Sequence, residues 1–204
     1  MKINIFISLL SISLVTGCLP NNNPPATIYT LSPQWNNSNT QTDQLTKFPL
    51  IIKLSPVRAT RSLTGTEILY TDSEHRWNSY VNSHWNDTPI KLLQTLIQVS
   101  IETSNLFKAV VPSTSVSTAD FLLESTLLDL SHHINEDGTA EGIIRIRFYL
   151  IDNSKRMVLA SREFVSQVPV SRLNAKAAVE ALNIAATSVT YDLISWLSEY
   201  DRFK

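Results

Sequence analysis

Residues 143–150 read Ile-Ile-Arg-Ile-Arg-Phe-Tyr-Leu, and this stretch decides the fold. Two sets of side chains alternate along it: Ile144, Ile146, Phe148 and Leu150 in one set, Ile143, Arg145, Arg147 and Tyr149 in the other. Successive side chains of a β-strand point to opposite faces of the sheet. The stretch therefore predicts a strand with one face in the core and the other facing water or a partner.

The segments on either side extend this strand into a three-stranded antiparallel meander. The apolar segment 121–134 precedes it, and Asn135-Glu136-Asp137-Gly138 is typical of a hairpin turn, because Gly tolerates a positive φ. A turn at 152–155 leads into a third strand that ends at Pro169. Its expected inner face consists of Val158, Ala160, Phe164 and Val168.

Two amphipathic helices and three shorter strands complete the expected domain. Apolar residues recur at helical spacing over 89–105, where Asp87-Thr88-Pro89 places a capping side chain just before the proline, and over 174–197, where Asn174 can cap. Strands are expected at 50–54, 66–71 and 76–85. The predicted fold is α/β of the α+β type: a mixed, mostly antiparallel sheet covered by two main helices in a single compact domain.

Composition agrees with one folded domain and excludes several functions. The chain has 204 residues, 43% of them hydrophobic, and a net charge of −1 without a basic stripe, which argues against nucleic acid as a partner. Its 4 glycines do not cluster into a phosphate-binding loop. Its single cysteine, Cys18, excludes an intramolecular disulfide and a multi-cysteine zinc site.

The first residues resemble a bacterial lipoprotein signal. Lys2 precedes an apolar run of about 13 residues, which is too short to span a bilayer. The run ends in a sequence that resembles a lipobox: Leu14, Val15, Thr16, Gly17 and Cys18. The alternative is an ordinary signal peptide with a chance cysteine. We expect a signal peptide at 1–17, a lipidated N-terminus and tether at 18–27 and a domain at 28–204.

The tether and the residue after the cysteine predict where the domain is held. Residues 19–25 are polar and Pro-rich, and about 8 residues of flexible tether reach roughly 16 Å. Lipoproteins of bacteria with two membranes often carry aspartate after the cysteine when they stay in the inner membrane, and this chain has Leu19. The expected location is therefore the periplasmic face of the outer membrane, with the covalent lipid on Cys18 and no other cofactor.

A search for catalytic and metal-binding patterns finds no recognisable motif. There is no Gly-x-Ser-x-Gly nucleophile turn. The adjacent His132 and His133 would point to opposite faces of a strand and could not chelate one metal ion. We therefore expect neither a catalytic residue nor a metal site.

Two groups of side chains are candidates for contact with a partner or a lipid. Arg145 and Arg147 share a strand face and could meet phosphate or an acidic partner, or pair with Glu163 across the strands. Trp77, Tyr80 and Trp85 form the densest aromatic segment, and could belong to an interface or to the core. Alternation places Trp77 and Trp85 on one face and Tyr80 on the other.

The chain resembles the ABC-type transport auxiliary lipoproteins over nearly all of its mature length. The family includes the lipoprotein of the paraquat-inducible system and relatives encoded beside MCE-type lipid transporters. The resemblance is carried, in order, by Tyr29-Thr30-Leu31, Glu67-Ile68-Leu69-Tyr70, His84-Trp85, Leu92-Leu93, 104–110, Ala119-Asp120, Leu159-Ala160-Ser161-Arg162, Val168-Pro169, 178–183, Asp192-Leu193 and Trp196-Leu197. It departs from the family at the Asn/Thr-rich loop 34–47 and at His75-Arg76-Trp77.

This resemblance implies a function without catalysis. It implies a periplasm-facing lipoprotein that works with an MCE-domain protein, an ABC ATPase and a permease in moving lipids between two membranes, and homo-oligomerisation into a ring is plausible for such a protein. The alternative is an autonomous lipid-binding or lipoprotein-chaperone protein that carries acyl chains in its own cavity. An envelope hydrolase is the remaining alternative, with little support from the residues.

Overall fold

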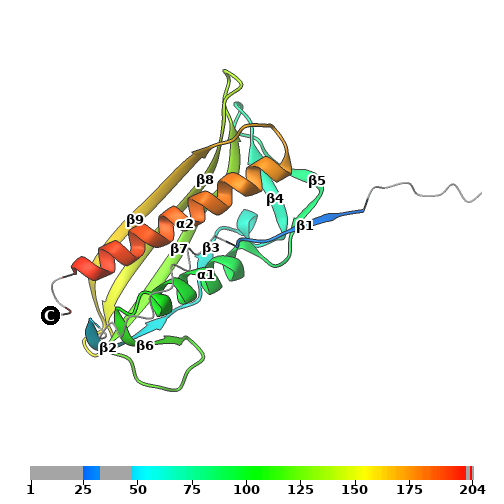
Figure 1. Ribbon diagram of the computed structural model, residues 1–204. Helices are drawn as coiled ribbons and strands as arrows, with labels where there is room; N and C mark the ends of the chain where they lie inside the picture. The colour runs from blue at the N-terminus through cyan, green and yellow to red at the C-terminus, as the bar shows by residue number, and fades with distance from the viewer. Residues whose placement is uncertain (1–24, 33–46, 201–202, 204) are drawn as a thin grey trace, which may run out of the picture.

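The computed structural model describes residues 25–32, 47–200 and 203, which form one nine-stranded sheet and a layer of helices (Figure 1). The expected signal peptide, Cys18 and most of the loop at 34–47 lie outside these residues. The strands are β1 (Thr27–Tyr29), β2 (Phe48–Leu54), β3 (Arg58–Ala59), β4 (Glu67–Thr71), β5 (Trp77–Trp85), β6 (Phe107–Pro112), β7 (Phe121–Ile134), β8 (Ala140–Asp152) and β9 (Met157–Pro169). The helices are α1 (Pro89–Thr103), α2 (Ala175–Glu199) and the short 3₁₀ helix η1 (Arg61–Leu63).

Strand β7 is the centre of the sheet because both of its edges are paired. On one edge it pairs with β8 from Phe121 to Ile134, and β8 pairs in turn with β9, which confirms the predicted meander. On its other edge three short strands follow one another: β2 at the start of β7, β3 in the middle and β4 at the end. Segment 48–71 thus runs alongside β7 for most of its length.

The sheet is mixed, as expected, but the prediction that it is mostly antiparallel is only partly right. Among the described strands, β7–β8, β8–β9 and β4–β5 are antiparallel, whereas β1–β5, β2–β6, β2–β7, β3–β7 and β4–β7 are parallel. Parallel neighbours need a crossover connection. Helix α1 lies in the connection that leads from β5 to β6, which pairs in parallel with β2, and β6 was not anticipated as a strand.

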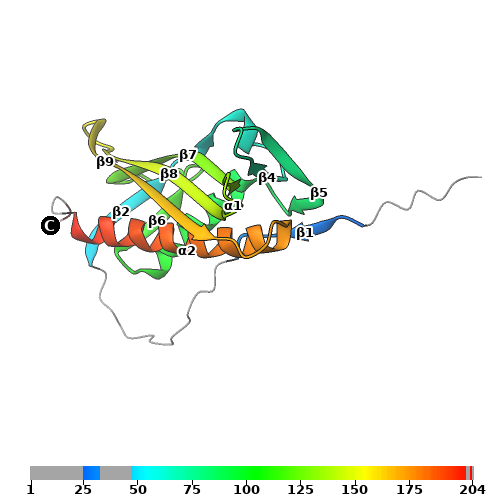
Figure 2. The same cartoon turned by 90° about the horizontal axis from the view of Figure 1, so that it is seen from above.

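Both helices lie on the same side of the sheet, as Figure 2 shows in the view from above. Helix α2 begins where predicted, because the Asn174 side chain accepts a hydrogen bond from the Ala177 N–H at 2.9 Å. Helix α1 begins after Thr88, the N-cap residue just before Pro89, but no side chain caps it, and Asp87 accepts a hydrogen bond from the Thr88 N–H. Among the described residues no helix is long and apolar enough to cross a membrane.

Two strands break the simple alternation that the sequence suggested. Val158 was expected on the inner face of β9 but is 59% exposed, because a register shift next to Leu150 inverts the alternation at the start of the strand. In β5, Trp77 is 46% exposed and Trp85 only 2% exposed, although both were assigned to one face. Asn82, with φ 57°, and a register shift against β4 separate the two halves of β5.

Close packing of α2 on the sheet leads to the first prediction. A Cβ atom added at Gly142 of β8 would lie 2.9 Å from the Cβ of Ala181 and 3.1 Å from the backbone N of Leu182, both in α2. Gly142→Val should therefore lower the free energy of unfolding by about 1–3 kcal/mol, because the helix must move away from the sheet. Urea unfolding of the full chain measures this change.

The matched control is Ser161→Val, which adds apolar volume at an exposed position of β9. It should change the free energy of unfolding by no more than about 0.5 kcal/mol. Equal losses in the two variants would contradict the tight contact between β8 and α2.

Candidate partner-binding surface

The helices leave one face of the β7–β8–β9 meander uncovered. Gly142 lies under α2, so its neighbours in the strand, and the residues paired with them, point to the other side of the sheet. We call this side the outer face and define it by Asp129, Ser131, His133, Ile143, Arg145, Arg147, Glu163 and Val165. Ser131 and Ile143 of this face are buried, whereas Val165, Arg145 and Arg147 are exposed and available to a partner of the folded domain.

The two arginines of the outer face converge on one carboxylate. Arg147 Nη2 donates to Glu163 Oε2 at 2.5 Å, and Arg145 Nη1 lies 3.8 Å from Glu163 Oε1. The hydrogen bond to Glu163, together with Tyr149, raises the pKa of Arg147 above its ordinary value. Pairing with Glu163, one of the two alternatives from the sequence, is thus observed, and both guanidinium groups remain about half exposed.

Beside the arginines, a serine, an aspartate and a histidine come together on β7. The Ser131 hydroxyl donates to Asp129 Oδ1 at 2.7 Å, and His133 Nε2 lies 2.8 Å from Asp129 Oδ2. In a catalytic triad the histidine stands between serine and carboxylate and takes the hydroxyl proton. Here the carboxylate stands in the middle, so His133 is not placed to activate Ser131.

The edge of the meander is apolar and open. Among the described strands β9 pairs only with β8, so its other edge keeps free backbone N–H and C=O groups. Met157, Val158 and Val165 of β9 are exposed. An exposed, partly apolar edge strand is a template for pairing with another chain, so the outer face and this edge form one continuous candidate surface.

A groove of about 380 Å³ lies at one end of the outer face. Its lining comes from the β4–β5 turn and the β7–β8 hairpin, and includes Thr71, Asp72, His75, Trp77, His133 and Glu136. Register explains why these residues meet, because Thr71 pairs with Trp77 on one side and with His133 on the other. Figure 1 shows the turn and the hairpin at the same end of the molecule.

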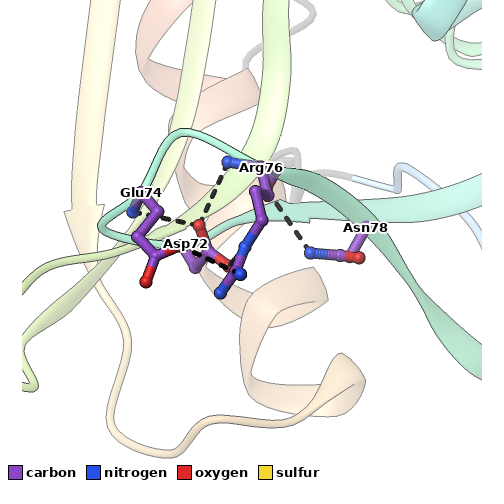
Figure 3. Close-up of polar contacts among 4 residues, drawn as sticks. All are labelled: Asp72, Glu74, Arg76 and Asn78. Atoms are coloured by element: carbon purple, nitrogen blue, oxygen red, sulfur yellow. Dashed lines mark hydrogen bonds and ion pairs between the residues drawn. The ribbon is translucent and has the colours of Figure 1, made fainter.

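The β4–β5 turn is held in shape by one carboxylate (Figure 3). Asp72 Oδ1 accepts the backbone N–H groups of Glu74 and Arg76, each at 3.0 Å, and Asp72 Oδ2 accepts Arg76 Nε at 2.8 Å. Arg76 also pairs with Glu74 at 2.9 Å. The hydrogen bond from the Arg76 side chain lowers the pKa of Asp72 below its ordinary value, because it favours the charged carboxylate.

The three aromatic candidates from the sequence do not form one surface. Trp77 lines the groove, Trp85 belongs to the core, and Tyr80 is half-buried against His132.

His132 is fully buried and its neighbour His133 points to the outer face, as the alternation predicted. The contact between Tyr80 and His132 could not be anticipated, because 52 residues separate them and no motif links them.

Half-buried Tyr80 and fully buried His132 form a neutral hydrogen-bonded pair. A hydrogen bond of 2.6 Å joins the Tyr80 hydroxyl and His132 Nδ1, and His132 Nε2 has no hydrogen-bond partner among the described residues. Burial raises the pKa of Tyr80 to about 12, with a smaller effect of Tyr70. Burial also lowers the pKa of His132 below its ordinary 6.5, and the charge of His133 adds to this.

The depressed pKa of His132 predicts a pH dependence of stability. Below pH 6.5 the unfolded chain takes up a proton at His132 that the folded chain does not, so the free energy of unfolding falls as the pH falls. The slope from this one group is at most about 1.4 kcal/mol per pH unit. Urea unfolding between pH 7.5 and 5 measures it.

The double variant Tyr80→Phe/His132→Phe is the control, because it keeps both rings and removes both polar partners. It should unfold near the wild-type urea concentration at pH 7.5 and lose part of the slope below pH 6.5. The other histidines are the same in both proteins, so the difference in slope reports His132. Identical slopes would show that His132 titrates in the folded protein as it does in the unfolded chain.

Solved structures with this fold come from several bacteria. Protein XCC0632 from Xanthomonas campestris, assigned to family model DUF330, matches with a TM-score of 0.74 and 20% identity over 84% of this chain and 94% of that chain. An uncharacterized protein matches with a TM-score of 0.65 and 13% identity, over 86% of this chain and 100% of that chain. Hypothetical protein CT253 from Chlamydia trachomatis matches with a TM-score of 0.53 and 8% identity, over 74% of this chain and 97% of that chain. Identities this low establish the fold alone.

Sequence comparison then identifies the family. A search of curated proteins finds no match. The model of a family described as ABC-type transport auxiliary lipoprotein component matches residues 29–193, from β1 into the last turns of α2. The match covers strands β2 to β9, helix α1 and most of α2, and it confirms the family that the sequence resembles. The chain belongs to the ABC-type transport auxiliary lipoprotein component family.

Proposed function

We propose that this lipoprotein is a non-enzymatic component of an MCE/ABC-type system that moves lipids between two membranes. The observation that carries the proposal is the family match over residues 29–193, which makes the chain an auxiliary lipoprotein of ABC-type transport. Its place in the system is the periplasmic face of the outer membrane. Its task is to bind the MCE-domain protein of the system and hold it at that membrane.

The anchor is the covalent lipid on Cys18. The lipobox residues 14–17 support cleavage before this cysteine. Three acyl chains bury several tens of CH₂ groups at about 0.8 kcal/mol each, so the protein does not leave the membrane once lipidated. Strand β1 begins at Thr27 and pairs with Ser83–Trp85 of β5, so the tether joins the domain at that part of the sheet.

The partner surface is the outer face together with the free edge of β9. This surface combines exposed Val165 with the half-exposed guanidinium groups of Arg145 and Arg147. Arginine is enriched in protein interfaces, and the buried centre of an interface is more apolar than the rest of the protein surface. The free edge of β9 also supports the expected homo-oligomer, because a strand of a second copy could pair there.

The alternative of an acyl-carrying protein has less support. The apolar sides of both helices are packed on the sheet, with Ile101, Leu182 and Leu193 fully buried. The groove is lined by charged and polar side chains such as Asp72 and Glu136, which do not suit an acyl chain. These observations favour a role in binding a transport protein over a role in carrying the lipid.

Site-specific photo-crosslinking in intact envelopes tests the proposal. A photoreactive amino acid at Val165 or Arg145 of the full-length lipoprotein should capture the MCE-domain protein, because both positions lie on the outer face. The same group at the exposed residues Ile184 or Tyr191 of α2 should not. Cys18→Ala should abolish the crosslink from the outer face by removing the anchor.

The captured protein is identified by mass spectrometry, and lipid in the same eluate is analysed. Capture of the MCE-domain protein from α2 alone would move the partner surface to the helical layer. If neither face captured it while lipid copurified with the lipoprotein, the acyl-carrying alternative would replace the proposal.

A further inference from the structure

We infer that the groove between the β4–β5 turn and the β7–β8 hairpin binds an arginine side chain presented by a protein partner, stacked on Trp77 and paired with Glu136. This site lies at one end of the outer face and shares His133 with it, but it is separate from the arginines and the β9 edge assigned above to the MCE-domain protein. The inference depends on the residues that line the groove, and it holds for any transport system in which the lipoprotein takes part.

The charge of the groove selects a cation. Asp72 and Glu136 line it, and no Lys or Arg does. The carboxylate of Asp72 is already paired with Arg76, which also binds Glu74. Glu136 is exposed and has no ion-pair partner among the described residues. One negative charge in the groove is therefore free for a ligand.

Trp77 supplies a flat aromatic surface beside this charge. Trp77 is 46% exposed and does not belong to the hydrophobic core of the described residues, so part of its surface is free to contact a ligand. Tryptophan is the best aromatic partner for a cation, and a planar guanidinium can stack on its ring while it pairs with a carboxylate. These two features together favour arginine over a neutral or anionic ligand.

The groove is prepared for a ligand before it binds. The hydrogen bonds of Asp72 to the backbone of the turn fix the segment that carries His75 and Trp77. His133, on the opposite wall, is held by its contact with Asp129 at 2.8 Å. A ligand therefore meets walls that are already ordered, which lowers the entropy that binding costs.

The position of the groove favours a protein over the membrane that holds the lipoprotein. Trp77 begins β5, whereas the tether strand β1 pairs with Ser83–Trp85 at the other end of β5. A fully extended strand of this length spans roughly 25 Å, and the break at Asn82 shortens this distance. The groove therefore lies well away from the point where the lipid tether joins the domain, on a part of the domain that another protein can reach.

Fluorine NMR of the mature full-length lipoprotein in detergent micelles tests the site. The chain has 4 tryptophans, so labelling with 5-fluorotryptophan gives four signals, and Trp77→Phe identifies the signal of Trp77. The probe is N-acetyl-arginine amide. Its addition should shift the Trp77 signal in a saturable manner and leave the signal of buried Trp85 unchanged, which also shows that the fold is intact.

Two variants and one analogue make the test specific. Glu136→Gln should weaken the affinity for N-acetyl-arginine amide about two- to fivefold, as expected for an exposed ion pair. The matched control Glu102→Gln, at an exposed site on α1, should leave it unchanged. N-acetyl-citrulline amide has the same shape without the charge, and it should bind much more weakly.

Three outcomes would overturn the inference. The Trp77 signal could stay unmoved at high concentrations of the arginine probe, or it could respond equally to citrulline. It could also respond more strongly to glycerophosphoethanolamine than to arginine, which would make the groove a site for a lipid headgroup. The experiment contains no transport protein, so its failure would leave the crosslinking test of the proposed function unaffected.

Discussion

The whole domain depends on the pairing of β7 along both of its edges. One edge is satisfied by β8 over the full length of β7, and the other by β2, β3 and β4 in succession. A central strand of this kind leaves no long row of unpaired backbone groups, and its apolar residues must be covered. Leu123, Leu127 and Leu130 of β7 are accordingly buried, on the side of the sheet that the helices cover.

The helices form a single layer on one side of the sheet. Helix α2 can approach β8 closely because Gly142 has no side chain, and its small residues Ala178, Ala181 and Ala185 are buried there. The hydrophobic core of the described residues lies on this side of the sheet. The other side keeps arginines, a carboxylate and a valine, a composition that suits contact with a protein better than a second core.

The same pairing places the groove at one end of the sheet. Thr71 of β4 connects Trp77 to His133, so two loops that are about 60 residues apart in the sequence become the walls of one site. The turn that carries Trp77 is held by Asp72 and Arg76, and the outer face beside it is held by Glu163 and Asp129. These contacts order the side chains of the groove and of the outer face before a partner binds.

The sequence by itself determined the family, the meander and both helices, because strict alternation over 143–150 and apolar spacing in the helical segments are local properties of the chain. It also predicted the alternation of His132 and His133 and offered Glu163 as a partner for the arginines. Only the tertiary structure decided the parallel pairing of 48–71 along β7, the opposite exposure of Trp77 and Trp85, the contact of Tyr80 with His132, and the groove. These four features depend on register shifts or on contacts between distant segments. Register shifts and distant contacts leave no periodic signal in the sequence.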